Sequence, residues 1–354
     1  MINPVAIRLL NQQLAAPQFF TPSEVVAHMG AMQAQDYRMM RWAVGLRMRK
    51  PSGTAFLKDY NGGRIIRIHL LRGTWQLIAA EDYRWMLDLC APKSTSVIQG
   101  WMKANRVCIS EKERSDIKDI VVRTIEHKSS VTKEEIAAAI EDATGRRMDD
   151  HRLSYHLRLA ELDGTLVSGD LHPRKATYSL TAQKIKPAAP VCRDESLALL
   201  ARKYFQSHSP ATLEDFVWWT GLNVGDCKKG IHLLGDDIHT ERWKERVFYL
   251  LNQCRTRGFR HGKTLLLPPF DEYLVGYKSR DLVLAPEYIH RAHNRNGIFY
   301  PVIARDGIIC GNWHIAKERV QTDLFDKEEQ IECDVTGLEH IKDMMCGAQD
   351  GIWP

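Results

Sequence analysis

Residues 64–79 read RIIRIHLLRGTWQLIA, and they contain two short runs that are typical of β-strands. The runs RIIRIHLL and TWQLIA are rich in β-branched and aromatic residues and are separated by Arg72 and Gly73. We therefore predict a two-stranded ribbon. Three helical segments precede the ribbon, with Thr21 and Asp36 placed to cap the second and third. Three helices followed by a ribbon are the plan of a winged helix-turn-helix unit.

The same plan recurs twice further along the chain. Three helical segments and a hairpin are predicted between residues 115 and 180, and Thr132 with Glu135 has the spacing of a capping box. After the linker KIKPAAP, three more helical segments are predicted between residues 196 and 235. Beyond residue 262, short β-branched and aromatic runs alternate with turn residues, which indicates antiparallel strands.

The predicted fold class is α+β, with three tandem winged helix-turn-helix units followed by a small antiparallel β-barrel-like domain. The predicted boundaries are 1–108 for the first unit, 109–185 for the second, 186–261 for the third and 262–354 for the C-terminal β-domain.

Composition and cysteine usage narrow the class of protein. The chain has 354 residues, of which 44% are hydrophobic and 26% charged, as expected for a soluble globular protein. No apolar run is long enough to span a membrane, and the N-terminus lacks the features of a signal peptide. The eight cysteines form no CxxC pair, which argues against a zinc site or a disulfide framework. We therefore expect a cytoplasmic protein.

The distribution of charge is more informative than the net charge of +5. Residues 37–58 contain no acid and six basic residues, which are Arg38, Arg41, Arg47, Arg49, Lys50 and Lys58. A basic face of this kind either binds a polyanion or is simply solvated. No Walker, dinucleotide-binding, HExxH or GxSxG motif occurs. His290 and His293 lie three apart without a third ligand, so no metal or other cofactor is predicted.

Each run of the predicted ribbon carries two polar residues that are two positions apart. Arg67 and His69 share one face of the first run, and Thr74 and Gln76 share one face of the second. These side chains either line a cleft or form the solvated face of a wing. Asp271 and Glu272 lie beside a double proline and are either catalytic or cap a turn. Trp218 and Trp219 lie on a predicted helix and are assigned to the core.

Several motifs together resemble one family. MQAQ (residues 32–35), RIHLLRGTW (67–75), AAEDYRWM (79–86) and LLPPFDEYLVGYKSR (266–280) are similar to motifs of the winged-helix alkylpurine DNA glycosylases. This is the family of the azinomycin-resistance and cross-link-repair glycosylases, and the resemblance extends to about residue 315. It implies a concave, basic surface that binds double-stranded DNA. It also implies excision of cationic N7-alkylated purines and, in some members, unhooking of interstrand cross-links.

The resemblance implies roles for particular residues. Gln33 and Gln35 match the family's catalytic pair, whose second position is an acid in other members. An N7-alkylpurine leaves readily because it is cationic, so an amide that positions water and stabilises the sugar cation is sufficient. Residues expected to bind DNA or lie near the lesion are Arg38, Arg41, Arg67, His69, Arg72, Thr74 and Gln76. The sequence departs from the family pattern at Gln76, where histidine is expected after Thr-Trp.

Two other classes of protein remain alternatives. A non-enzymatic winged-helix transcription factor would bind one operator sequence, usually as a dimer. A protein-interaction scaffold of winged helices would need no basic cleft. On the glycosylase interpretation, we expect a monomer without an obligate protein partner.

Overall fold

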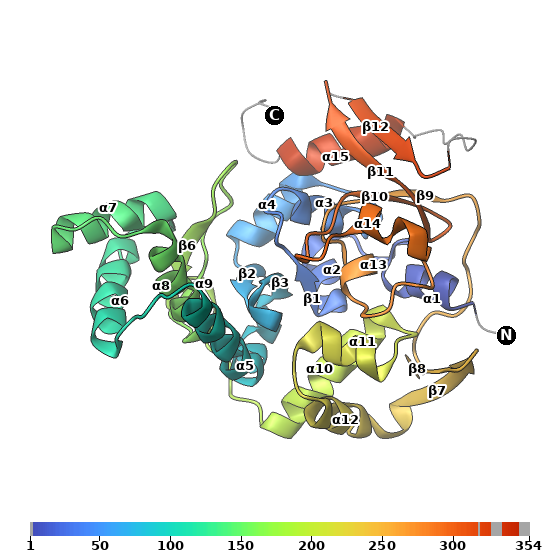
Figure 1. Ribbon diagram of the computed structural model, residues 1–354, viewed down its shortest axis with the longest axis horizontal. Helices are drawn as coiled ribbons and strands as arrows, with labels where there is room; N and C mark the ends of the chain where they lie inside the picture. The colour runs from blue at the N-terminus through green and yellow to red at the C-terminus, as the bar shows by residue number, and fades with distance from the viewer. Residues whose placement is uncertain (1–2, 318, 327–334, 347–354) are drawn as a thin grey trace.

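The described part of the protein combines helices with four small antiparallel sheets. A computed structural model describes residues 3–317, 319–326 and 335–346. Figure 1 shows helices α6, α7 and α8 gathered at one end of the molecule, away from the strands β9 to β12 near the C-terminus. In these ranges, no helix combines the length and apolar character that crossing a bilayer requires.

The N-terminal segment carries the first sheet. Its elements are α1 (Pro4–Asn11), α2 (Pro22–Met29), β1 (Ala31–Gln33), α3 (Met39–Gly45), α4 (Gly53–Asn61), β2 (Ile65–His69), η1 (Leu71–Gly73), β3 (Trp75–Ala79), η2 (Ala80–Asp82) and α5 (Tyr83–Ala104). The strand order is β1-β3-β2, so the predicted ribbon is present and gains a third strand from the segment after α2.

The extra strand β1 arises because α2 ends earlier than predicted. Gly30 adopts φ 77°, a conformation that side-chain-bearing residues avoid, and its N–H donates to the carbonyl of Val26. The chain then leaves the helix and pairs with β3 from Ala31 onward. Thr21 caps α2 in a capping box with Glu24, as the sequence predicts.

The middle of the chain contains the predicted helices and hairpins together with short elements that the sequence did not predict. Residues 111–184 form α6 (Glu111–Ile125), β4 (Val131–Thr132), α7 (Lys133–Thr144), α8 (Asp150–Leu162), β5 (Leu166–Ser168), β6 (Thr177–Leu180) and α9 (Thr181–Lys184). Residues 193–251 form α10 (Arg193–His208), α11 (Leu213–Thr220), α12 (Val224–His232), η3 (Gly235–Asp237), β7 (Ile238–Trp243) and β8 (Arg246–Leu251).

The C-terminal strands form an open sheet and not the predicted barrel. The elements are β9 (Thr264–Leu267), α13 (Glu272–Val275), η4 (Pro286–Tyr288), α14 (Ile289–Ala292), β10 (Val302–Arg305), β11 (Ile308–Ala316), β12 (Arg319–Leu324) and α15 (Val335–Cys346). Among the described residues, the order is β12-β11-β10-β9 and the two outer strands do not pair. The sheet does not close because it buries Ile303 and Trp313 against the N-terminal segment.

The hydrophobic cores join segments that lie far apart in the sequence. Leu9 and Leu14 of the N-terminal segment pack with Leu267 and Tyr273, and Ile68 of β2 shares a cluster with Trp219 of α11. A cluster centred on Ile136 lies almost entirely within residues 117–178. The prediction that both tryptophans of α11 are core residues is half right, because Trp219 is fully buried whereas Trp218 is 39% exposed.

Candidate active site

The sheet β1-β3-β2 has two faces, and its front face carries Gln33, Gln76 and the adjacent Thr74. Gln33 and Gln76 are direct cross-strand partners. The Gln33 side-chain oxygen accepts hydrogen bonds from Gln76 Nε2 (2.7 Å), Thr74 Oγ1 (3.2 Å) and Arg72 Nη2 (3.3 Å). Because this oxygen has three donors, the Gln33 amide nitrogen is the group left for a ligand. That nitrogen makes no hydrogen bond to the described part of the chain, although Gln33 is only 7% exposed.

Arg72 connects this face to α11. Its guanidinium donates to the carbonyls of Trp218 (3.2 Å) and Trp219 as well as to Gln33. Arg72 adopts φ 56°, a left-handed conformation that costs a non-glycine residue free energy and often marks functional sites. Burial lowers the pKa of Arg72, and the negative charge of Glu272 opposes that shift. A cation thus lies within hydrogen-bonding distance of the Gln33 amide.

The Glu272 side chain anchors the backbone of the same glutamine, Gln33. The buried Glu272 carboxylate accepts a hydrogen bond from the backbone N–H of Gln33 at 2.6 Å. Gln33 is therefore fixed at both its backbone and its side chain, as a preorganised site requires. The sequence left the role of this acid open.

Gln35 differs from Gln33 in every respect. It lies after the end of β1, is exposed, and its side chain makes no hydrogen bond within the described ranges. The peptide between the two glutamines is fixed, because Nε and Nη2 of Arg67 both donate to the Ala34 carbonyl at 3.0 Å. Asp36 then accepts from the backbone N–H groups of Arg38 at 3.0 Å and Met39 at 2.8 Å, so it caps the turn that leads into α3. The N-cap position of α3 itself is Arg38, two residues later than predicted, and its side chain makes no capping hydrogen bond.

The back face of the sheet carries Arg67, His69 and Trp75. His69 is paired with Glu161 of α8 at 2.5 Å and lies against the Trp75 ring, whose other neighbour is the Arg67 guanidinium. Arg67 and His69 are buried. The idea that they line one cleft with Thr74 and Gln76 is therefore wrong. The strand register places the two pairs on opposite faces, and Ser168 of β5 and Glu161 of α8 contact Arg67 and His69.

Burial controls the titration of the back face. It raises the pKa of the Glu161 carboxyl to about 8 and lowers the pKa of His69 well below its usual value. Burial also lowers the pKa of Arg67. These groups form an enclosed polar junction between two segments of the chain.

The basic stretch of residues 37–58 does not form one continuous surface. Arg41 is 2% exposed and donates to the Met345 carbonyl at 2.9 Å, while the fully buried Arg47 forms a two-pronged ion pair with Asp271. Both arginines satisfy interior acceptors and are not placed to meet a polyanion. Arg38 is half-buried, and Arg49, Lys50 and Lys58 are exposed.

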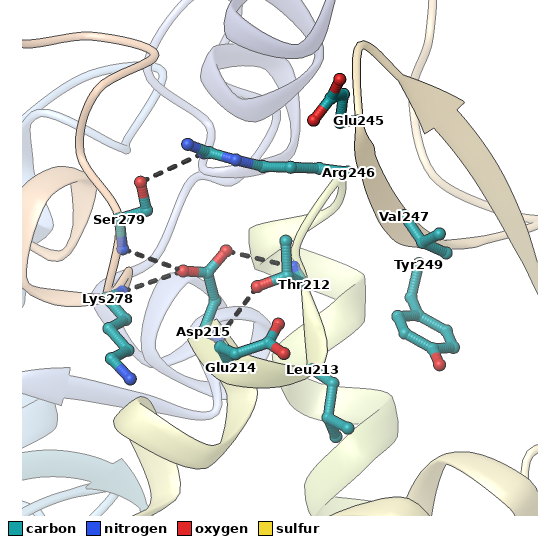
Figure 2. A pocket seen from close by; sticks show the side chains of 10 residues that line it. All are labelled: Thr212, Leu213, Glu214, Asp215, Glu245, Arg246, Val247, Tyr249, Lys278 and Ser279. Atoms are coloured by element: carbon teal, nitrogen blue, oxygen red, sulfur yellow. Dashed lines mark hydrogen bonds between the residues drawn. The ribbon is translucent and has the colours of Figure 1, made fainter.

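A hollow of about 780 Å³ lies elsewhere, between α11, the β7–β8 hairpin and residues 278–279. Figure 2 shows Asp215 at its base, accepting hydrogen bonds from the backbone N–H groups of Thr212, Lys278 and Ser279. Arg246 spans it to Ser279 at 3.1 Å and also pairs with Asp281. Because these polar groups satisfy one another, we assign the hollow to the junction of three segments and not to chemistry.

Candidate metal ligands do not cluster. In the portion of the chain that the structure describes, no group of three or more histidine, cysteine, aspartate or glutamate side chains is placed to bind a metal ion.

Comparison with known proteins identifies the family. A family model described as "DNA glycosylase AlkZ-like" matches residues 26–335, which include β1, the hairpin β2–β3 and Glu272. The chain belongs to the AlkZ-like DNA glycosylase family. It is therefore a DNA glycosylase, and its substrate is DNA.

One relative and one solved structure, both from Streptomyces sahachiroi, are similar to this AlkZ-like glycosylase over most of its length. The interstrand DNA cross-link repair glycosylase of Streptomyces sahachiroi is 23% identical over 329 residues, covering 87% of this chain and 86% of the relative. The solved structure of Streptomyces sahachiroi DNA glycosylase AlkZ has a TM-score of 0.77 at 20% identity, covering 97% of this chain and 96% of that chain. That structural likeness shows that the two chains share a fold.

Proposed function

We propose that the protein hydrolyses the N-glycosidic bond of cationic N7-alkylated purines in double-stranded DNA, and that it unhooks interstrand cross-links built on such purines. The observation that carries this proposal is the fixed Gln33 beside the exposed Gln35, at the end of a strand in an AlkZ-like glycosylase. The printed name of the Streptomyces relative supports the cross-link part.

The two glutamines have different proposed roles. Gln33 presents its amide N–H groups because its oxygen is occupied, whereas Gln35 has a free amide oxygen that can orient a water molecule. The C1′–N9 bond breaks and the base keeps the electron pair, so the cationic base departs neutral. Water then bonds to C1′ of the oxocarbenium-like sugar and loses a proton to solvent.

The proposed reaction leaves an intact abasic site. A β-lyase needs an amine that forms a Schiff base with the sugar. The chain has no lysine between residues 1 and 49, and the side chains that contact the Gln33 oxygen belong to Arg72, Thr74 and Gln76. Borohydride should therefore trap no covalent adduct with damaged duplex, and EDTA should leave activity unchanged.

We further propose that residues 1–108, 109–185 and 186–261 each form a winged helix-turn-helix, and that the chain acts as a monomer. The support is the recurrence of helices followed by a hairpin in each segment. Arg38 would contact phosphate and Arg72 would orient the Gln33 amide beside the lesion, while Arg41, Arg67 and His69 support the site from the interior.

The test is single-turnover release of base from a duplex containing one N7-methylguanine. We expect release by the wild type, loss in Gln33→Ala and Gln35→Ala, and no release from undamaged duplex. Absence of release by the folded wild type would contradict the proposed substrate. High-affinity binding to one short undamaged sequence would instead favour a transcription factor.

A further inference from the structure

We propose that Glu272 is the positioning residue of this site: it fixes Gln33 through its backbone and offsets the charge of Arg72 next to a cationic substrate. This inference rests on the proposed function. Glu272 is 1% exposed and lies 239 residues from Gln33 in the sequence, yet its Oε1 accepts the Gln33 N–H at 2.6 Å. This contact joins α13 to strand β1.

Within the described residues, no lysine or arginine hydrogen-bonds to the Glu272 carboxylate, which accepts from the Gln33 backbone N–H, Trp219 and His208. Its Oε2 lies 3.2 Å from Trp219 Nε1 and 3.3 Å from His208 Nε2. With the His208 proton on Nε2, the ring donates to Glu272 while Nδ1 accepts from the Ser207 hydroxyl at 2.8 Å. Burial lowers the pKa of His208, which favours this neutral ring. The charge of Glu272 is therefore not cancelled by a cation in contact with it.

The neighbouring acid shows what a purely structural carboxylate looks like here. Asp271 caps α13 by accepting the N–H of Tyr273 and is neutralised directly by Arg47 at 2.8 Å. Neither of these contacts of Asp271 reaches β1. Two adjacent buried acids thus differ in one respect that matters: only Glu272 reaches the glutamine.

The uncancelled charge of Glu272 has a natural counterpart in Arg72. Arg72 donates to the Gln33 side-chain oxygen, and Glu272 raises the pKa of Arg72 against the effect of burial. A guanidinium next to a cationic purine and a developing sugar cation would raise the barrier to bond cleavage. A buried carboxylate at the Gln33 backbone N–H offsets that repulsion while Arg72 still orients the side-chain amide.

The first experiment measures position without substrate. Hydrogen exchange of the Gln33 backbone N–H, resolved with overlapping peptides, should be faster in Glu272→Ala than in the wild type. In Asp271→Asn it should be unchanged. Equal exchange at Gln33 in the wild type and Glu272→Ala would overturn the inference whether or not the proposed substrate is right.

The second experiment measures chemistry with N7-methylguanine duplex under single-turnover conditions. Glu272→Gln keeps the size of the side chain but removes its charge. It should slow release roughly 10- to 100-fold, as for other residues that orient a reactive group, with DNA affinity within about twofold. Asp271→Asn should lower the melting temperature without slowing release by the folded protein.

A double-mutant cycle separates charge from stability. If Glu272 offsets Arg72, the slowing caused by Glu272→Gln should be smaller in an Arg72→Gln background than in the wild type. Independent, multiplying losses would overturn the charge role. An active wild type with an equally active Glu272→Gln would overturn the inference alone, whereas an inactive wild type would contradict the proposed function.

Discussion

The two faces of the sheet β1-β3-β2 both carry polar side chains but treat them differently. On the back face, His69 and Arg67 have their polar groups occupied by Glu161 and the Ala34 carbonyl and are buried. On the front face, Gln33 is equally well anchored, but only through its backbone and its oxygen. On the proposed assignment of Gln33, the difference teaches that a functional polar residue is one that the fold fixes without using all of its hydrogen-bonding groups.

The largest expected effect is at the end of the strand that carries the front face. Gln35→Ala should remove most excision activity, with a loss of about 2–4 kcal/mol of transition-state stabilisation. Because Gln35 is exposed and holds no other side chain, the melting temperature and DNA affinity of the variant should stay near wild type. Single-turnover rates measured beside binding and melting curves check this. Wild-type rates in this variant would remove Gln35 from the site.

Changes to the back face should alter how the free energy of unfolding depends on pH and should leave the rate of base release unchanged. The pKa of Glu161 is about 8 in the folded protein, above its ordinary value of 4.5, so the native state binds a proton more tightly than the unfolded chain. Stability from this group is complete below pH 4.5 and is lost progressively as pH rises from there through 8. The lowered pKa of His69 acts in the opposite direction, but only below its ordinary value of 6.5.

The clear window is therefore pH 6.5 to 8, where unfolding free energy should fall by up to about 2 kcal/mol. Glu161→Gln should flatten this decline while leaving base release by the folded protein unchanged. Denaturant titrations at three pH values in the window provide the measurement. Parallel pH profiles for the two proteins would show that Glu161 does not titrate there.

A smaller effect is expected at Gln76, which supplies one of three donors to the Gln33 oxygen. Gln76→Ala should cost about 1 kcal/mol of transition-state stabilisation, because the donors from Thr74 and Arg72 remain. Gln76→His tests the departure from the family pattern, since an imidazole N–H can replace the amide donor. We expect the Gln76→His variant to release base at a rate closer to wild type than the alanine variant does. Identical rates in all three proteins would separate Gln76 from the site.

The smallest effect is expected at the surface. Arg38→Ala should weaken duplex binding without changing the rate of release from bound DNA. The slope of log affinity against log salt should become shallower by about 0.9 if Arg38 neutralises one phosphate. Lys58→Ala, which changes an exposed residue of α4, is the comparison variant. An unchanged salt slope in Arg38→Ala would exclude the phosphate contact.

Local chemistry made much of the fold predictable. The capping box at Thr132 is present, Asp36 caps the turn that leads into α3, and the hairpin formed where β-like runs flank Arg72 and Gly73. Strand β1 was missed because its three residues are too few for a periodic pattern. The runs beyond residue 262 are compatible with a sheet or a barrel. The barrel-like prediction is wrong because closure depends on which surface a sheet buries, and this sheet buries the surface that faces the N-terminal segment.

The site was predictable only in part. The resemblance selected Gln33 and Gln35, but spacing alone could not say that Arg41 turns inward to the Met345 carbonyl. Period two correctly paired Arg67 with His69 and Thr74 with Gln76, yet only the cross-strand register decides which pair faces which side. The sequence shows Glu272 only as an acid in a predicted loop. Its contact with Gln33 spans 239 residues, so no local pattern could predict it.

The most direct test of the account compares one variant from each face in the same assay. Gln33→Ala and Glu161→Gln would be assayed for single-turnover release of N7-methylguanine from duplex DNA, at about pH 6.5 and at a temperature where both are folded. The account predicts a loss of roughly 30-fold or more in Gln33→Ala and a rate within about threefold of wild type in Glu161→Gln. A slow Glu161→Gln beside a fully active Gln33→Ala would contradict it, and would move the site to the back of the sheet.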